Sequence, residues 1–209
     1  MTFPPVIRLF FAVELTSSIK DEIERYIHAL RQKSKSKAIR WTKPENLHIT
    51  LQFLPSVASD DLPLLSENVE RAIQSISRYP AFSLGDLRLY PSLYHPRVIV
   101  FDVTPQDALS PLAEAVGDGI KKTHYQVEER PFRAHLTIGR IKQPRGVGLQ
   151  FLNEVEAPVI NGIAVREVTL YRSEPHPEGS QYRVIKRMPL GGLYDQPGLP
   201  PQGSSTFEL

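Results

Sequence analysis

The sequence contains no cysteine and no long uninterrupted apolar segment. Without cysteine, the 209 residues can form no disulfide, offer no thiolate nucleophile and build no cysteine zinc site. No apolar run approaches the ~20 residues that a membrane-spanning helix needs. Residues 1–15 lack the basic start, long apolar stretch and small-residue cleavage site of a signal peptide. We therefore expect a cytoplasmic protein that does not associate with membranes.

Several motifs of phosphate and acyl chemistry are also missing. The chain has neither the P-loop pattern G-x-x-x-x-G-K-[ST] nor the nucleophile elbow G-x-S-x-G. No dense cluster of histidines and carboxylates is visible, so we predict no metal site and no cofactor. The formal net charge of +2 permits a polyanionic partner but does not argue for one.

The apolar residues that are present follow an order of strands and helices that occurs twice. The first copy comprises a strand at 8–15, a helix at 16–30, a strand at 48–54, a helix at 59–77 and a strand at 81–90. The second comprises a strand at 97–103, a helix at 110–120, a strand at 135–140, a strand at 162–171 and a last strand at 181–190. The second copy retains little of the later helix, because its counterpart around 147–156 is short.

This repeat predicts the fold class. A duplicated β–α–β unit without glycine-rich phosphate turns is typical of an α+β protein with mainly antiparallel sheets. We expect a single bilobal domain over residues 1–190, with pseudo-twofold halves at about 6–91 and 92–190. Two sheets should flank a central cleft, with the helices outside. Residues 191–209 are rich in Gly, Pro and Ser and indicate a flexible C-terminal tail.

A His-x-Thr motif occurs at matching positions of the two copies. His48 and Thr50 stand two apart in an apolar run, so in a strand they point to one face while Ile49, Leu51 and Phe53 point to the other. His135 and Thr137 repeat the pattern. One such motif is most often structural, but two in the same apolar frame of a repeat favour a functional site. Two similar lobes facing each other bring both histidines to a shared cleft.

Two imidazoles with pKa values near ~6.5 suit hydrolysis of a phosphodiester at neutral pH. One histidine takes a proton from the attacking water, and the other gives a proton to the leaving sugar oxygen. The hydroxyls of Thr50 and Thr137 donate hydrogen bonds to the phosphate oxygens. These arguments leave open which histidine is the acid.

Two arginines near the second motif are further candidates for binding phosphate. Arg133 lies two residues before His135 and shares its face if the strand extends that far, and Arg130 lies further out. A guanidinium group pairs with a phosphate through two parallel hydrogen bonds. We assign no catalytic role to the other four histidines, and we expect Trp41 and Phe132 to lie in the core rather than to stack on bases.

The segments RLFFAVEL, IRWTKPENLHITLQFL, RPFRAHLTIGRIK and QYRVIKRMPL resemble the two-histidine (2H) phosphoesterases, in particular the bacterial RNA 2′,3′-cyclic phosphodiesterases, also described as 2′-5′ RNA ligases. The resemblance covers nearly all of the chain except the tail. It implies a bilobal, metal-free enzyme that opens a terminal 2′,3′-cyclic phosphate to a 2′-phosphomonoester. By motif, His48 resembles the proton donor, His135 the proton acceptor, and Thr50 and Thr137 the phosphate ligands.

Two positions depart from the family pattern. Pro55 stands where the family usually has Gly, and Ala134 stands where Pro is usual. We expect RNA ends or nucleotide cyclic phosphates as substrates and a monomeric protein. Two other readings stay open. One is a 2H phosphodiesterase for a small cyclic phosphate or a 2′-5′-linked oligonucleotide, and the other is a non-catalytic RNA- or nucleotide-binding module.

Overall fold

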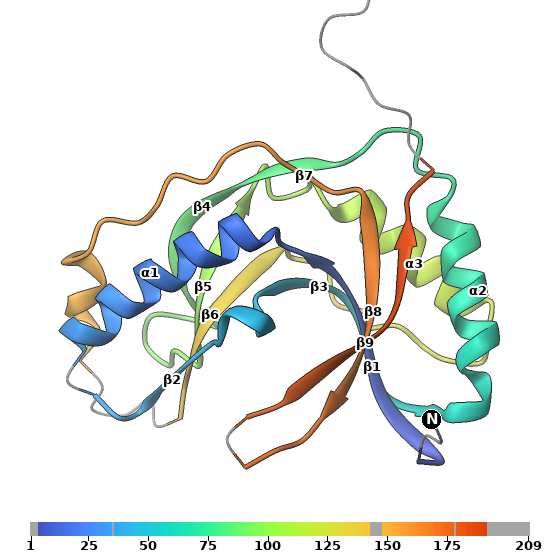
Figure 1. The fold of residues 1–209 in the computed structure, drawn as a ribbon, viewed down its shortest axis with the longest axis horizontal. Coiled ribbons are helices and arrows are strands. Elements are labelled where there is room, and N and C mark those ends of the chain that lie inside the picture. The colour runs from blue at the N-terminus through green and yellow to red at the C-terminus, as the bar shows by residue number, and fades with distance from the viewer. Residues whose placement is uncertain (1–3, 35, 143–147, 178, 192–209) are drawn as a thin grey trace, which may run out of the picture.

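The structure is a computed structural model that describes residues 4–34, 36–142, 148–177 and 179–191. Two antiparallel sheets form its centre (Figure 1). The first sheet has the order β3 (His48–Ala58), β1 (Val6–Glu14), β8 (Glu167–Glu174) and β9 (Gln181–Pro189). The second has the order β2 (Ile39–Trp41), β6 (His135–Ile141), β5 (Val98–Thr104), β4 (Ala81–Tyr90) and β7 (Ile163–Ala164). The predicted tail lies outside the described residues except for Gly191.

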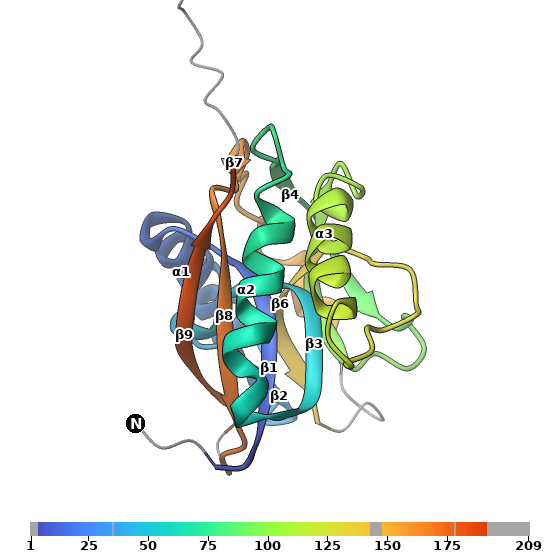
Figure 2. The ribbon, with the colours of Figure 1, turned by 90° about the vertical axis from the view of Figure 1, so that its right-hand side faces the viewer.

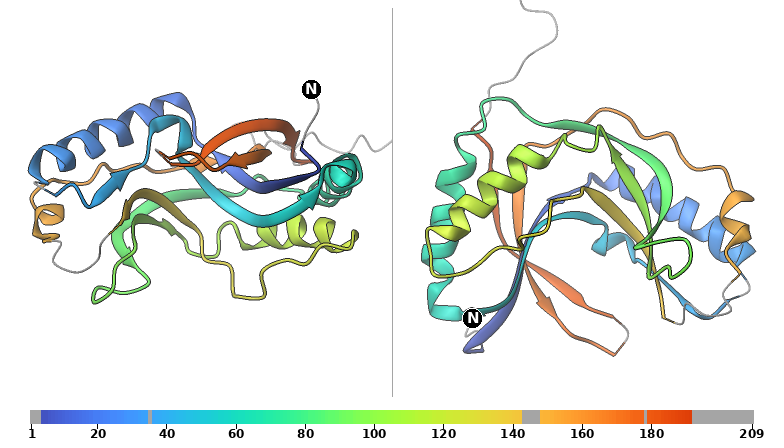
Figure 3. Two further views of the ribbon diagram at one scale, coloured as in Figure 1. Left: turned by 90° about the horizontal axis from the view of Figure 1, so that it is seen from below. Right: turned by 180° about the vertical axis from the view of Figure 1, so that it is seen from behind.

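Three α-helices in the described part of the chain cover the outer faces: α1 (Ser17–Lys33), α2 (Leu62–Ile73) and α3 (Ser110–Lys121). Short 3₁₀ turns occur at η1 (Pro44–Asn46), η2 (Ser59–Asp61) and η3 (Gln150–Asn153). In Figure 2, α2 crosses in front of β1 and β8, with α3 beside it. In Figure 3, α1 and α3 lie at opposite ends and on opposite faces of the molecule. None of the described helices is long and apolar enough to cross a membrane.

The two copies exchange elements between the sheets. Strand β4 of the first copy pairs with β5 of the second, whereas β8 of the second copy pairs with β1 of the first. Helix α1 of the first copy packs on the second sheet, where the rings of Tyr26 and Phe101 lie 5.6 Å apart. Helix α3 of the second copy packs on the first sheet, where Gln52 donates a hydrogen bond to the carbonyl of Ala113. Each sheet is therefore built from both sequence halves.

The α+β class with two antiparallel sheets is confirmed, and most predicted elements occur within a few residues of their expected bounds. Residues 162–171 are a correction, because they form two strands rather than one. Ile163 pairs with Phe82 in the second sheet, while Glu167 pairs with Pro189 in the first. The chain changes sheets between β7 and β8, so it bends there.

Helix α1 shows how the sequence pattern builds the core. Its buried residues recur at the helical spacing and form one apolar stripe: Ile23, Tyr26, Ile27 and Leu30. Burial of one such side chain contributes about 1.5–3 kcal/mol. The opposite stripe is polar and exposed.

We predict that Gly119→Ala destabilises the fold by about 1–3 kcal/mol, the range of overpacked interiors. A Cβ at this position of α3 would lie 2.5 Å from Cα of Val69 and 2.9 Å from the carbonyl oxygen of Asn68, so α2 and α3 could not stay in contact. Gly117→Ala is the matched control, since its nearest neighbour is the mobile end of Gln52 at 3.3 Å.

Urea unfolding measures both variants. Gly117→Ala should be neutral or more stable by up to about 1 kcal/mol, because alanine favours a helix over glycine. Equal loss in both variants would contradict the close approach of the two helices at Gly119.

Candidate active site

The structure brings the two predicted motifs to one cleft. His48 is the first residue of β3 and His135 the first residue of β6, and these strands lie in contact where the two sheets meet (Figure 1). His48, Thr50, His135 and Thr137 all line a cleft of about 900 Å³. The residues lining it come from strands of both sheets, so the site exists only when both are assembled.

Each histidine is held by the same main-chain hydrogen bond. Nδ1 of His48 lies 2.7 Å from the carbonyl oxygen of Asn46, and Nδ1 of His135 lies 2.8 Å from that of Arg133. A carbonyl oxygen only accepts, so each Nδ1 carries a proton and Nε2 of the neutral ring is an acceptor. Nε2 of His48 lies 3.1 Å from the hydroxyl oxygen of Thr50, which donates to it. The hydrogen bonds at Nδ1 thus fix the orientation of both rings and make Nε2 the acceptor nitrogen in each.

Aromatic rings pack against the imidazole of His48. The rings of His48 and Phe10 have centroids 4.8 Å apart, and Tyr182 meets His48 edge-on at 5.3 Å. Tyr171 stacks on Phe10 behind them, at 5.0 Å. These rings take the place of water around the imidazole.

This environment changes the proton affinity of His48. The pKa of His48 is lowered from 6.5 to about 4: burial is the largest cause, the positive charges of Arg140, Lys20 and His135 act in the same direction, and the hydrogen bond to Asn46 opposes the shift. In the free protein His48 is therefore neutral at pH 7. An anion bound beside it would raise its pKa again, because opposite charge favours the protonated ring.

Both motif strands contain a β-bulge one residue after the threonine. In β3, Thr50 pairs with Ala12 but Gln52 pairs with Phe11, so Leu51 is an extra residue. The alternation of faces shifts by one beyond it. Phe53 is a correction for this reason: it was predicted on the apolar face, yet it is 38% exposed and lines the cleft.

The second bulge brings an unpredicted cation to the site. In β6, Thr137 pairs with Val100 and Gly139 with Ile99, so Ile138 is the extra residue. Arg140 then points to the cleft, at the position that Phe53 takes in the other copy. Strict alternation excludes Arg140 from the face of His135, which is why sequence reasoning missed it. The available signal was Gly139, since glycine inside a strand often marks a bulge.

The cleft is cationic although the whole chain is nearly neutral. One acidic side chain, Glu45, is among the residues that line it. The basic side chains that line it are Arg8, Arg40, Lys43, Arg140 and Arg183. Such a cluster between walls of low dielectric attracts anionic ligands. The guanidinium of Arg8 also lies 5.5 Å from the centre of the Phe53 ring, so the cleft offers an aromatic face beside its positive charge.

The two arginines predicted from sequence lie outside the residues that line this cleft. The guanidinium of Arg133 lies 4.8 Å from the centre of the Tyr90 ring and 3.9 Å from the Asp102 carboxylate. Arg130 pairs with Glu128 at 2.7 Å and is largely exposed. The site thus takes its guanidinium groups from other positions than the two arginines that precede His135.

Two side chains that were assigned no part in substrate binding or catalysis also line the cleft. Trp41 packs edge-on against Phe151 with ring centroids 6.3 Å apart, yet it also lines the cleft. His176, which received no role, lines the cleft as well. Phe132 packs against the core, as expected. Among the residues that the structure describes, no group of three or more His, Cys, Asp and Glu side chains is placed to hold a metal ion.

The family described as LigT-like phosphoesterases matches the chain twice, over residues 13–100 and 101–182. The chain belongs to this family. The double match agrees with the internal repeat, and the predictions of a 2H phosphoesterase and of an enzyme are confirmed.

Relatives and solved structures cover nearly all of the chain. The RNA 2′,3′-cyclic phosphodiesterase of Methanothermobacter thermautotrophicus is 31% identical, over 84% of this chain and 95% of its own length. That of Archaeoglobus fulgidus is 29% identical, over 86% and 98%. A crystal structure from Thermus thermophilus has the same fold, with a TM-score of 0.73 and 24% identity over 90% of this chain and all of the other. E. coli LigT complexed with 3′-AMP has a TM-score of 0.67 and 28% identity over 88% and 98%.

We predict that the imidazole of His48 in the free protein titrates only near pH 4 in histidine NMR spectra, as its lowered pKa requires. Arg140→Met should raise the pKa of His48, because one of the repelling charges is removed. Arg130→Met removes the same group at a site away from the cleft and is the matched control. Titration of His48 near its ordinary value, or an equal shift in both variants, would contradict this account.

Proposed function

We propose that the protein hydrolyses terminal 2′,3′-cyclic phosphates of RNA to 2′-phosphomonoesters by acid–base catalysis with two histidines and no metal. The observation that carries the proposal is the presence of both His-x-Thr motifs, each with its histidine fixed through Nδ1, in one cationic cleft. The proposal is supported by relatives named RNA 2′,3′-cyclic phosphodiesterase and by a similar protein, E. coli LigT, that has been solved with 3′-AMP.

The reaction divides into two proton transfers around one displacement at phosphorus. A water oxygen attacks the phosphorus while Nε2 of His135 takes one of its protons. The bond from phosphorus to the 3′ oxygen breaks, and His48 gives its proton to that oxygen. The products are a 2′-phosphomonoester and a free 3′ hydroxyl. The enzyme is left with His135 protonated and His48 neutral, and exchange with water restores the starting state.

His48 can act as the proton donor only if it is protonated in the complex with the substrate. Its pKa near 4 in the free protein leaves it neutral at pH 7. A bound phosphodiester carries a negative charge into the cleft and raises that pKa, so His48 is protonated in the complex. Thr50, Thr137 and Arg140 line the same space and hold the phosphate oxygens through hydroxyl and guanidinium donors.

The direct test is hydrolysis of adenosine 2′,3′-cyclic phosphate and of a short RNA that ends in a cyclic phosphate, followed by ³¹P NMR. We expect the 2′-phosphomonoester as the product, with an unchanged rate in EDTA. His135→Ala purified in parallel should lower kcat by about 10²-fold or more, which excludes a contaminating nuclease.

Three outcomes would contradict the proposal. A chelated, inactive enzyme that zinc or manganese restores would rule out the metal-free mechanism. Cleavage of a 2′-5′-linked oligonucleotide in preference to cyclic phosphates would favour the other substrate class. Tight binding of the RNA without turnover would indicate a binding module.

The threonines give a further prediction. Thr50→Val and Thr137→Val should each cost about 1.5–3 kcal/mol of transition-state stabilisation, since each loses one hydrogen bond to a charged phosphate. Measured kcat/KM on adenosine 2′,3′-cyclic phosphate gives the loss.

Thr169→Val is the matched control for this pair. Thr169 lies in β8 with a fully buried hydroxyl that has no hydrogen-bond partner among the described residues. Its replacement should leave kcat/KM unchanged and should keep or raise the free energy of unfolding, because the buried polar atom is removed. Unchanged kinetics in Thr50→Val and Thr137→Val would make these threonines part of the strand wall only.

A further inference from the structure

Each catalytic-motif histidine has an acidic residue directly opposite it on the neighbouring strand. Asp102 of β5 pairs with His135 of β6 in the strand register. Glu14 of β1 pairs with His48 of β3 in the same way. No motif in the sequence marked either carboxylate, and neither lines the cleft.

A tyrosine is duplicated together with each carboxylate. The hydroxyl of Tyr90 donates a hydrogen bond to the Asp102 carboxylate, and Tyr171 makes the corresponding bond to Glu14. Tyr90 stands opposite Val98, four positions before Asp102, and Tyr171 stands opposite Phe10, four positions before Glu14. The tyrosine–carboxylate pair is therefore a feature of the repeated unit, like the His-x-Thr motif itself.

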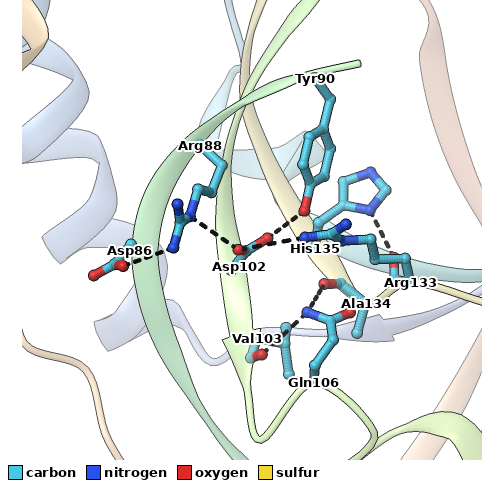
Figure 4. A network of polar contacts seen from close by, with 9 residues as sticks. All are labelled: Asp86, Arg88, Tyr90, Asp102, Val103, Gln106, Arg133, Ala134 and His135. Atoms are coloured by element: carbon cyan, nitrogen blue, oxygen red, sulfur yellow. Dashed lines mark hydrogen bonds and ion pairs between the residues drawn. The ribbon is translucent and has the colours of Figure 1, made fainter. Parts of the chain in front are cut away.

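Tyr90 and Asp102 are linked to His135 in two ways, through the Tyr90 ring and through Arg133 (Figure 4). The Tyr90 ring meets the His135 ring edge-on, with centroids 5.7 Å apart. The guanidinium of Arg133 lies over the Tyr90 ring, 4.8 Å from the ring centre, and 3.9 Å from the Asp102 carboxylate. The carbonyl of the same Arg133 accepts the hydrogen bond from Nδ1 of His135. Asp102 thus holds both the ring next to His135 and the residue that orients it.

The main chain before His135 needs such support. Residues 131–134 form no helix or strand, so no ladder of hydrogen bonds fixes the carbonyl of Arg133. Gln106 donates a hydrogen bond to the carbonyl of Ala134 at 3.2 Å, which ties this segment to the chain after β5. Arg88 pairs with Asp102 at 3.3 Å and helps to balance its charge, since the Asp102 side chain is only 15% exposed.

We propose that Asp102 is a positioning residue for His135: through Tyr90 and Arg133 it keeps the imidazole in the orientation and tautomer that leave Nε2 free for the attacking water. This proposal depends on the proposed function in one respect, the role of Nε2 as the base; the positioning of the ring does not depend on it. Burial and the Asp102 carboxylate together raise the pKa of Tyr90 to about 12, so the hydroxyl remains a donor at the pH of the reaction.

Asp102→Asn tests this, with two readouts. On adenosine 2′,3′-cyclic phosphate, kcat should fall about tenfold or more while KM stays within about twofold, the scale of losing an orienting partner. In long-range ¹H–¹⁵N spectra of the neutral imidazoles, the resonance lost in His135→Ala identifies His135. Its pattern should change from a proton on Nδ1 to a mixture of both tautomers, while that of His48 stays unchanged. The tautomer readout needs no turnover, so it remains valid if the proposed activity fails.

Asp86→Asn is the matched control, because Asp86 joins this cluster through Arg88 at 3.0 Å and its side chain is 79% exposed. It should change neither readout. Tyr90→Phe keeps the ring and removes the hydrogen bond to Asp102. It is the second test variant if Asp102→Asn does not fold. It should shift the His135 tautomers in the same direction. An unchanged His135 pattern in the folded variants, or a loss that appears equally in Asp86→Asn, would overturn the proposal.

Discussion

In each copy of the repeat, the histidine Nδ1 donates to the carbonyl oxygen two residues earlier, at 2.7 Å for His48 and 2.8 Å for His135. This bond fixes the tautomer, and so it decides which nitrogen is available for chemistry. Each histidine is the first residue of its strand, so the carbonyl that accepts this bond belongs to the segment before the strand. Before β3 that segment is the 3₁₀ turn η1, and before β6 it is irregular chain held by side chains. The exchange of β4 and β8 between the sheets holds the two strand starts against one cleft.

A duplicated scaffold does not make the two histidines equivalent. His48 lies among Phe10 and Tyr182, and its burial is the main reason that its pKa falls to about 4. His135 lies instead beside Tyr90, Arg133 and Asp102, which are polar or charged. Acid–base catalysis by a pair needs environments that differ in this way, because two identical imidazoles have no reason to divide the roles. The side chains packed around each histidine thus give the two imidazoles different environments, which the repeated backbone alone does not.

Strand alternation was enough to place each histidine beside its threonine, because these residues precede the bulges, and the repeat brought the pair His48 and Thr50 together with the pair His135 and Thr137. Phe53 and Arg140 lie beyond the bulges, where alternation gives the wrong face. The exchange of β4 and β8 was not predictable, since the same apolar pattern serves a strand in either sheet. The partners of Arg133 were hidden for a similar reason: Asp102 and Tyr90 lie on other strands, and only the register brings them next to it.

The central claim is that two fixed imidazoles share one displacement at phosphorus, one as acid and one as base. A substrate whose leaving group needs no proton separates them most directly. In 3′-deoxyadenosine 2′-(p-nitrophenyl phosphate) the leaving phenolate departs unprotonated, so the variant that lacks the acid should recover activity. We predict that His48→Ala recovers on this substrate relative to the cyclic phosphate and that His135→Ala does not. Recovery of His135→Ala alone would reverse the roles, and equal losses on both substrates in both variants would contradict acid–base catalysis by this pair.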